Sequence, residues 1–195
     1  MASDDLRAMI SGMVARVSPL DRQEASDQAD ILGWIASGQP VFRTAPPAAS
    51  PKHLVSYFAL IDSASRLVLL GDHVKSGLWL PSGGHVEDGE DPNDTVDREA
   101  SEELGIRAVF HDRLGAGRPF FLTVTPTLGE HSHLDVSLWF VLACVSTAEL
   151  DPDPRGYRGA RWFPLDRREG WPADRFDPEM GRFISKVKAA LDGSR

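Results

Sequence analysis

The chain has 195 residues, of which 42% are hydrophobic and 26% charged, the composition of an ordinary globular protein with one well-buried core. Its formal net charge of −8 argues against a general affinity for nucleic acid polymers. No run reaches the roughly eighteen apolar residues of a membrane span, and the first residues lack a signal-peptide core. The single cysteine, Cys144, excludes an internal disulfide, so we expect a buried thiol and a cytoplasmic protein.

Two short amphipathic helices are predicted at the start of the chain, over residues 4–17 and 20–37. Trp34 and Ile35 fall on the apolar side of the second helix, and the Gly-Gln-Pro sequence at 38–40 would end it. Such a pair could cover a sheet, form a dimer contact or cap a substrate pocket. Packing support is the role that we expect.

A run rich in proline and alanine follows, over residues 45–51, and predicts an extended connector. We therefore expect an N-terminal helical extension with its connector over residues 1–50. The remaining residues, 51–195, are expected to form the main domain.

The main domain is predicted to consist mostly of strands. They cover residues 54–61, 67–70, 78–80, 107–110, 120–125, 136–145 and 160–165, and the first two form a hairpin. One helix is predicted after Asp91 and another over residues 177–191. This order is not a run of alternating βα units. It fits an α/β fold with a mixed sheet between helices, an α/β/α sandwich.

The most informative segment covers residues 84–106. Glu99, Glu102 and Glu103 lie at helical positions i, i+3 and i+4, so they share one side of a helix. Like charges at this spacing repel by roughly 0.2–0.5 kcal/mol per pair. With Glu90 in the preceding loop, the pattern indicates a site for a hard cation, since oxygen ligands suit Mg²⁺ or Mn²⁺.

Local signals define this helix. Asp91 can serve as its N-cap, Pro92 fits its first position, and Gly105 can end it in the left-handed conformation. A second, apolar stripe is expected to pack against a sheet; it consists of Val96, Ala100 and Leu104. Residues 81–84, Pro-Ser-Gly-Gly, predict a tight turn whose backbone can approach a ligand closely.

The segment resembles the Nudix box, G-x5-E-x7-R-E-U-x-E-E-x-G-U, in which U is a bulky aliphatic residue. The matching residues are Gly84, Glu90, Arg98, Glu99, Glu102, Glu103, Gly105 and Ile106. The departure is Ala100, which is small where the first U is expected. Residues 77–84 are similar to the strand and turn that lead into the box, and the surrounding strand pattern extends the resemblance over about residues 52–166.

The resemblance implies a Nudix-type α/β/α sandwich and a Nudix pyrophosphohydrolase. Such an enzyme would cleave a diphosphate linkage in a nucleoside diphosphate derivative, for example a nucleoside triphosphate or a sugar nucleotide. The implied cofactor is Mg²⁺ or Mn²⁺, and the implied partner is a small nucleotide-type substrate. The chain is also compatible with a homodimer.

The resemblance also implies roles for individual residues. Glu99 and Glu103 would be the main metal ligands, and Glu102 would complete the site. The Gly83 carbonyl would add a ligand, while Glu90 would hydrogen-bond or ligate from the loop. Arg98 would orient the acids, and the proton of the attacking water would pass to Glu99 or to a residue outside the box.

A second constellation lies at residues 130–135, Glu-His-Ser-His-Leu-Asp. In an extended chain His131, His133 and Asp135 would face one way. Imidazoles suit a transition metal such as Zn²⁺. Substrate contact or proton transfer is the role that we expect more, with Glu130 as the candidate that activates water and Asp135 behind it.

Three further residues are candidates for substrate contact. Trp139 matches the polar side of its predicted strand and could stack on a base. Arg118 and Lys75 lie in predicted loops and could bind the outer phosphates.

Two other functions fit parts of the pattern. A prenyl diphosphate isomerase would need a cysteine and a glutamate as proton donor and acceptor, and the predicted burial of Cys144 in a strand counts against it. A non-catalytic nucleotide sensor would be expected to have lost metal-binding glutamates, and none is missing here.

Overall fold

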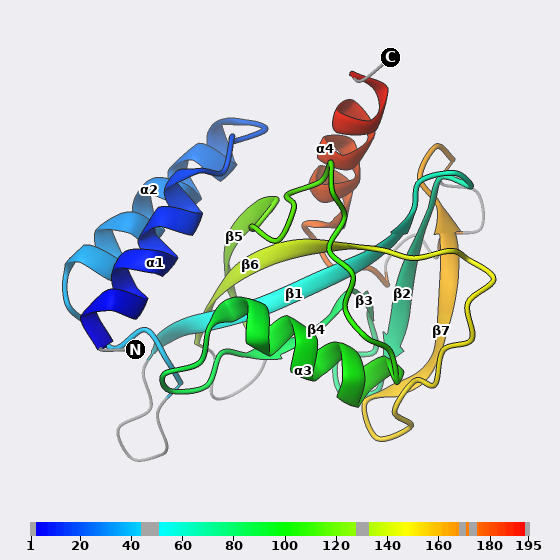
Figure 1. The fold of residues 1–195 in the computed structure, drawn as a ribbon, viewed down its shortest axis with the longest axis horizontal. Coiled ribbons are helices and arrows are strands. Elements are labelled where there is room, and N and C mark those ends of the chain that lie inside the picture. Colours follow the sequence, from blue (N-terminus) through cyan, green and yellow to red (C-terminus); the bar gives the residue numbers. More distant parts are fainter. Residues whose placement is uncertain (1–2, 44–50, 128–132, 168–170, 172–174, 194–195) are drawn as a thin grey trace.

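The computed structural model describes residues 3–43, 51–127, 133–167, 171 and 175–193. Within these residues a seven-stranded mixed sheet lies between helices (Figure 1). The strands are β1 (Lys52–Asp62), β2 (Leu67–His73), β3 (Trp79–Leu80), β4 (Ser82–His85), β5 (Phe121–Pro126), β6 (Leu134–Ala143) and β7 (Tyr157–Pro164). The helices are α1 (Ser3–Ala15), α2 (Arg22–Ala36), α3 (Pro92–Leu104) and α4 (Met180–Asp192). The predicted α/β/α sandwich is confirmed.

Strand β1 organises the sheet because it pairs along both sides. It runs parallel to β6, with Phe58 opposite Phe140. On the other side, β4 and β2 pair antiparallel with successive parts of β1, which confirms the predicted hairpin. Strand β5 extends the sheet beyond β6, whereas β3 and β7 both pair with β2.

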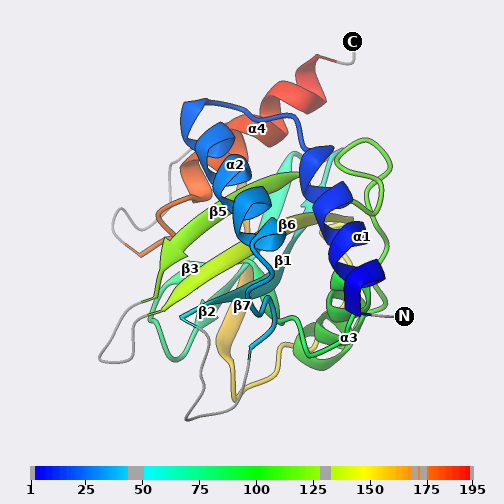
Figure 2. The ribbon, with the colours of Figure 1, turned by 90° about the vertical axis from the view of Figure 1, so that its left-hand side faces the viewer.

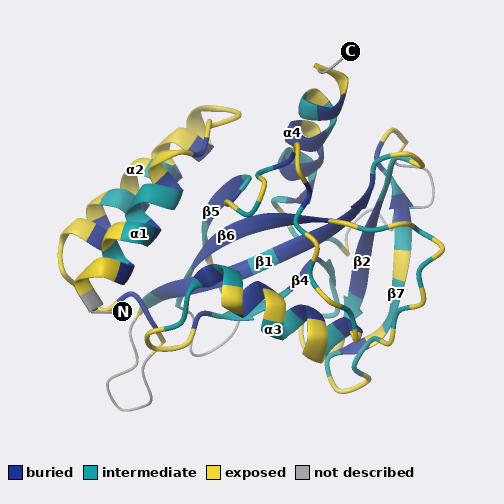
Figure 3. Cartoon of the chain, in the orientation of Figure 1, coloured by how far each residue is buried: buried dark blue, intermediate teal, exposed yellow. Residues whose placement is uncertain are grey.

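Alternation of side chains along β1 and β6 divides the core into two layers. Even-numbered residues such as Leu54 and Phe140 pack in one cluster with side chains of α1, α2 and α3. Odd-numbered residues such as Val141 pack against Phe183 and Val187 of α4. Figure 3 shows both strands buried between these helices. The sheet is thus covered on both faces.

Helices α1 and α2 lie side by side over the end of the sheet formed by β5 and β6 (Figure 2). Ile10 and Ile31 are fully buried in the same cluster as the strand residues. Asp21 caps α2 by accepting a hydrogen bond from the Glu24 amide. The Glu24 carboxylate is buried and accepts a hydrogen bond of 2.5 Å from Lys186 of α4. The two helices therefore have the packing role that we expected.

Three local predictions are wrong. Residues 81–84 do not form a tight turn, because the two glycines let this segment pair with β1 as strand β4. Residues 107–110 are not a strand, and in the described chain a single bridge joins Phe110 to Leu142. Cys144 is only half-buried, since β6 ends one residue before it.

Most of the predicted connector, residues 45–50, lies outside the described residues. No helix among the described residues is long and apolar enough to cross a membrane.

Candidate active site

Helix α3 carries the acidic residues and begins and ends where the sequence predicts. Asp91 accepts a hydrogen bond from the Asn93 amide, and Pro92 is the first helical residue. Gly105 ends the helix in the left-handed conformation, with φ of 65°. The predicted apolar stripe is buried and consists of Val96, Ala100 and Leu104. This burial fixes the rotation of the helix and directs two of its glutamates toward β4.

Glu103 is held against β4 and β7. Its Oε2 atom accepts hydrogen bonds of 2.9 Å from the Gly83 amide and of 2.9 Å from the Tyr157 hydroxyl. Burial nevertheless raises the pKa of Glu103 to about 7, and the nearby charge of Glu99 contributes to the rise. A proton or a cation at this position would therefore be bound favourably.

Glu99 lies one helical turn before Glu103 and packs on Gly84. A Cβ atom on Gly84 would overlap the Glu99 carboxylate, so this approach requires glycine. Burial raises the pKa of Glu99, although Arg98 donates a hydrogen bond of 2.6 Å to its Oε1. We call Glu99 and Glu103 together the carboxylate site.

Arg98 connects the carboxylate site to the loop before α3. Its guanidinium donates to both oxygens of Glu90, at 2.9 and 3.1 Å, and to the His85 carbonyl at 3.3 Å. Burial by itself would raise the pKa of Glu90. The hydrogen bonds from Arg98 and Thr95 outweigh this effect and hold the pKa below its ordinary value. Because both oxygens of Glu90 accept hydrogen bonds, its geometry favours hydrogen bonding over metal ligation.

Glu102 differs from the other acids. Its side chain is 61% exposed, and the nearest ion pair, with Arg98, measures 3.8 Å. It therefore lies beside the carboxylate site and faces solvent.

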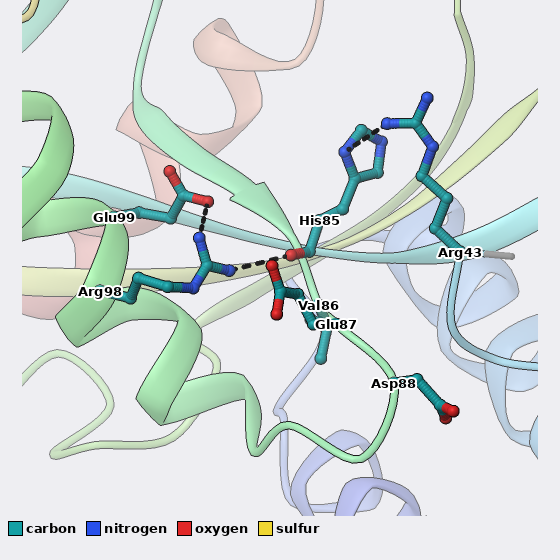
Figure 4. A pocket seen from close by; sticks show the side chains of 7 residues that line it. All are labelled: Arg43, His85, Val86, Glu87, Asp88, Arg98 and Glu99. Carbon is teal, nitrogen blue, oxygen red and sulfur yellow. Dashed lines mark hydrogen bonds and ion pairs between the residues drawn. The ribbon is translucent and has the colours of Figure 1, made fainter. Parts of the chain in front are cut away.

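A pocket of about 470 Å³ opens beside Glu99 (Figure 4). Its lining residues are Arg43, His85, Val86, Glu87, Asp88, Arg98 and Glu99. Figure 4 shows the His85 ring pointing away from Glu99 and toward Arg43, whose guanidinium lies 3.3 Å from its Nδ1 atom. The Glu99 carboxylate and the exposed Arg43 guanidinium thus lie on opposite sides of the pocket.

Trp139, which the sequence predicts to stack on a base of the substrate, is buried in the core. It is 1% exposed and packs against Phe121 and Phe183, and its indole N–H donates to Thr123 at 3.0 Å. Helix α4 covers the side of the strand that appeared polar, so the prediction that Trp139 stacks on a base is wrong.

The two predicted phosphate-binding residues are not among those that line the pocket. Arg118 is exposed and donates to the Gly115 carbonyl within its own loop. Lys75 is exposed in the loop between β2 and β3. Arg43 is the exposed cation that the structure brings to the pocket.

The second predicted constellation is described only in part. Glu130 and His131 lie outside the described residues. His133 and Asp135 lie at the start of β6, where they meet His53 and His85.

Arg43, Tyr157, His53 and His85 were not singled out from the sequence. Arg43, His53 and Tyr157 have no neighbouring motif. Strand pairing brings His53, His85 and Tyr157 to the site, whereas Arg43 lies in the segment before β1. For His85, the available signal was its position directly after Gly84, the first residue of the Nudix box.

The family model of the NUDIX domain matches residues 51–187, more than half of the chain. Among solved structures, a Nudix-family hydrolase from Clostridium perfringens is 21% identical, with a TM-score of 0.52 over 73% of this chain and 98% of the other. An Ap4A hydrolase from C. elegans is 18% identical, with a TM-score of 0.55 over 72% and 98%. A MutT protein from Methanosarcina mazei is 17% identical, with a TM-score of 0.55 over 75% and 98%.

At these identities the solved structures show a shared fold. The family match runs from β1 into α4, and it includes all of β4 and α3. The chain therefore belongs to the Nudix family, and its enzyme class is that of the Nudix pyrophosphohydrolases.

Proposed function

We propose that this chain hydrolyses the diphosphate linkage of a nucleoside diphosphate derivative with the help of Mg²⁺ or Mn²⁺. The observation that carries the proposal is the carboxylate site. Glu99 and Glu103 are close together, and burial raises the pKa of both carboxyl groups. A divalent cation would relieve the cost of two desolvated negative charges.

The donor set fits such an ion. Carboxylate oxygens are the ligands that Mg²⁺ and Mn²⁺ prefer, and the pocket beside Glu99 leaves room for substrate phosphates. Glu99 and Glu103 would hold the ion, with Glu102 and the Gly83 carbonyl as further ligands. When bound, the ion would neutralise phosphate charge and lower the pKa of a water molecule.

The remaining residues would position the reactants. Arg98 would orient Glu99 through its hydrogen bond, and Glu90 would fix Arg98 from the other side. Arg43 would attract an outer phosphate from across the pocket. Glu130 stays a candidate for the group that takes the proton of the attacking water, and Glu102 is a second candidate because its carboxylate is exposed.

The nucleotide substrate class is supported by the family and by the Ap4A hydrolase among the structural relatives. The isomerase alternative is weakened by the position of Cys144. The Cys144 amide donates to the Ile61 carbonyl at the hairpin end of β1, whereas the carboxylate site faces β4. A cytoplasmic location and a homodimer stay predictions.

The proposal is tested by incubating the purified chain with Mg²⁺ or Mn²⁺ and a panel of nucleoside triphosphates, sugar nucleotides and dinucleoside polyphosphates. Chromatography and mass spectrometry of the products should show cleavage of a diphosphate linkage, abolished by a chelator. Asp97→Asn, which removes an exposed acid of the same helix, should retain turnover.

Glu99→Gln should lower turnover by at least about 100-fold, because a metal ligand and the orienting contact with Arg98 are both changed. Nucleotide binding without turnover would favour the sensor function. Turnover that persists in the chelator would overturn the proposed metal dependence.

A further inference from the structure

Three histidines and one aspartate from distant parts of the sequence meet on one face of the sheet. Strand β1 lies between β4 and β6, and its His53 is the register partner of Asp135. His85 is the partner of Val55, two residues beyond His53 on the same face. His133 lies two residues before Asp135. We call His53, His85, His133 and Asp135 the histidine cluster.

Distances within the cluster match those of a metal site. One possible ligand atom from each residue lies within 4.8 Å of the others. Asp135 Oδ1 is 3.3 Å from His53 Nε2 and 3.2 Å from His133 Nε2. Ligands placed tetrahedrally about 2.0–2.1 Å from a Zn²⁺ ion are roughly 3.3 Å apart. Two edges of such a tetrahedron are therefore already present.

Within the described part of the chain, several possible ligand atoms of the histidine cluster are buried without a hydrogen-bond partner, which favours the binding of an ion. His53 is 2% exposed, and among the described residues neither of its ring nitrogens forms a hydrogen bond. Asp135 Oδ1 is likewise buried without one. Buried polar atoms are nearly always bonded to something, and one cation between His53 Nε2 and Asp135 Oδ1 would give each of these two atoms a partner.

His133 and His85 are positioned for metal binding in different ways. The Thr127 hydroxyl lies 3.3 Å from His133 Nδ1, which orients the ring so that Nε2 faces Asp135. The ring centroid of His85 lies 4.7 Å from that of His53, so the His85 ring already lies beside the other possible ligands. Arg43 contacts that ring now, but its side chain is exposed and can turn away.

The side chains of the histidine cluster favour a transition-metal ion over Mg²⁺, Mn²⁺ or an anion. Neutral imidazoles prefer transition metals, whereas the oxygen-only carboxylate site prefers Mg²⁺ or Mn²⁺. An anion is disfavoured because the Asp135 carboxylate lies between two of the rings. The His85 ring also points away from Glu99, which separates the two groups of ligands (Figure 4).

We propose that His53, His85, His133 and Asp135 bind one transition-metal ion such as Zn²⁺, at a site distinct from the carboxylate site. The ion would connect β4, β1 and β6 beside the pocket. This proposal concerns metal binding alone, and its test does not depend on whether the chain hydrolyses any substrate.

Metal-free full-length protein is titrated with Zn²⁺ against a chromophoric chelator, and bound zinc is counted by elemental analysis. A background of Glu99→Gln with Glu103→Gln removes the carboxylate site. In this background we expect one Zn²⁺ per chain, and visible absorption bands of tetrahedral Co²⁺ when cobalt replaces zinc.

Adding His85→Gln or His133→Gln to the background should weaken zinc binding by at least about 100-fold. His73→Gln, a histidine outside the cluster, should leave affinity unchanged, and Arg43→Gln should leave it unchanged or tighter because a nearby positive charge is removed. Circular dichroism checks that each variant is folded. Zinc binding that is absent from the background protein, or equal with and without His133→Gln, would overturn the proposal.

Discussion

Burial disfavours the charged form of the Glu103 carboxyl, so a cation beside it would be bound favourably. Its pKa rises from 4.5 to about 7 on folding, so the folded chain binds this proton more tightly than the unfolded chain. The resulting stabilisation is complete below about pH 4.5 and is lost as the pH rises through 7. In metal-free protein, unfolding should therefore become easier across this range.

Glu103→Gln removes the charge and keeps an oxygen that can accept from Gly83 and Tyr157. At pH 8 without metal, we expect the variant to be more stable than the wild type by about 1–3 kcal/mol, and the difference should disappear near pH 4.5. Urea unfolding at both pH values measures this. Glu102→Gln, at an exposed position, should change stability little. Equal stability of Glu103→Gln and wild type at pH 8 would refute the raised pKa.

The two glycines of β4 should respond differently to alanine. Gly83 has φ of 144° and its added Cβ would meet the backbone of Ser56, so Gly83→Ala should destabilise the fold by about 1–3 kcal/mol. At Gly84 the added Cβ would meet the movable end of Glu99. Gly84→Ala should therefore fold, yet lose about 100-fold in kcat because Glu99 is displaced. Urea unfolding and steady-state kinetics distinguish these outcomes, and full activity in Gly84→Ala would contradict the role of Glu99.

At the scale of elements, one buried ion pair joins the N-terminal helices to the last helix. Glu24 in α2 is fully buried, and Lys186 in α4 is 9% exposed. Glu24 also accepts hydrogen bonds from the Leu20 and Leu122 amides. The pair therefore fixes α2 against both β5 and α4.

Lys186→Met should lower the free energy of unfolding by about 3–5 kcal/mol, because Glu24 would remain buried without its cation. Adding Glu24→Gln to that variant should restore part of the loss, since the uncompensated charge is gone. Chemical denaturation of the two single variants and the double variant gives the coupling energy. Additive effects would show that the two side chains do not depend on each other.

Elements with strong local signals were predictable from the sequence. Helix α3 has its cap at Asp91, its proline at 92 and its left-handed Gly105 as expected. Strand β4 was not predicted, because Gly83 and Gly84 have the local chemistry of a turn and become a strand only by pairing with β1. The burial of Trp139 was missed for a similar reason, since α4 covers a face that alternation alone marks as polar.

At the scale of the whole molecule, the sheet separates the two groups of side chains that we propose to bind metal ions. The carboxylate site is contributed mainly by one helix, so its spacing was visible in the sequence. The histidine cluster is contributed by β4, β1 and the start of β6, and its outermost members, His53 and Asp135, are 82 positions apart in the sequence. No local pattern could reveal it, because only the strand register brings these residues together.

The central claim is that buried carboxylates hold divalent ions for hydrolysis, and Mn²⁺ binding followed by electron paramagnetic resonance tests it most directly. With a nucleoside diphosphate derivative present, the wild type and Asp97→Asn should bind Mn²⁺ equally. Glu99→Gln combined with Glu103→Gln should weaken this binding by at least about 100-fold and abolish turnover. Unchanged Mn²⁺ affinity together with unchanged turnover in the double variant would contradict the account.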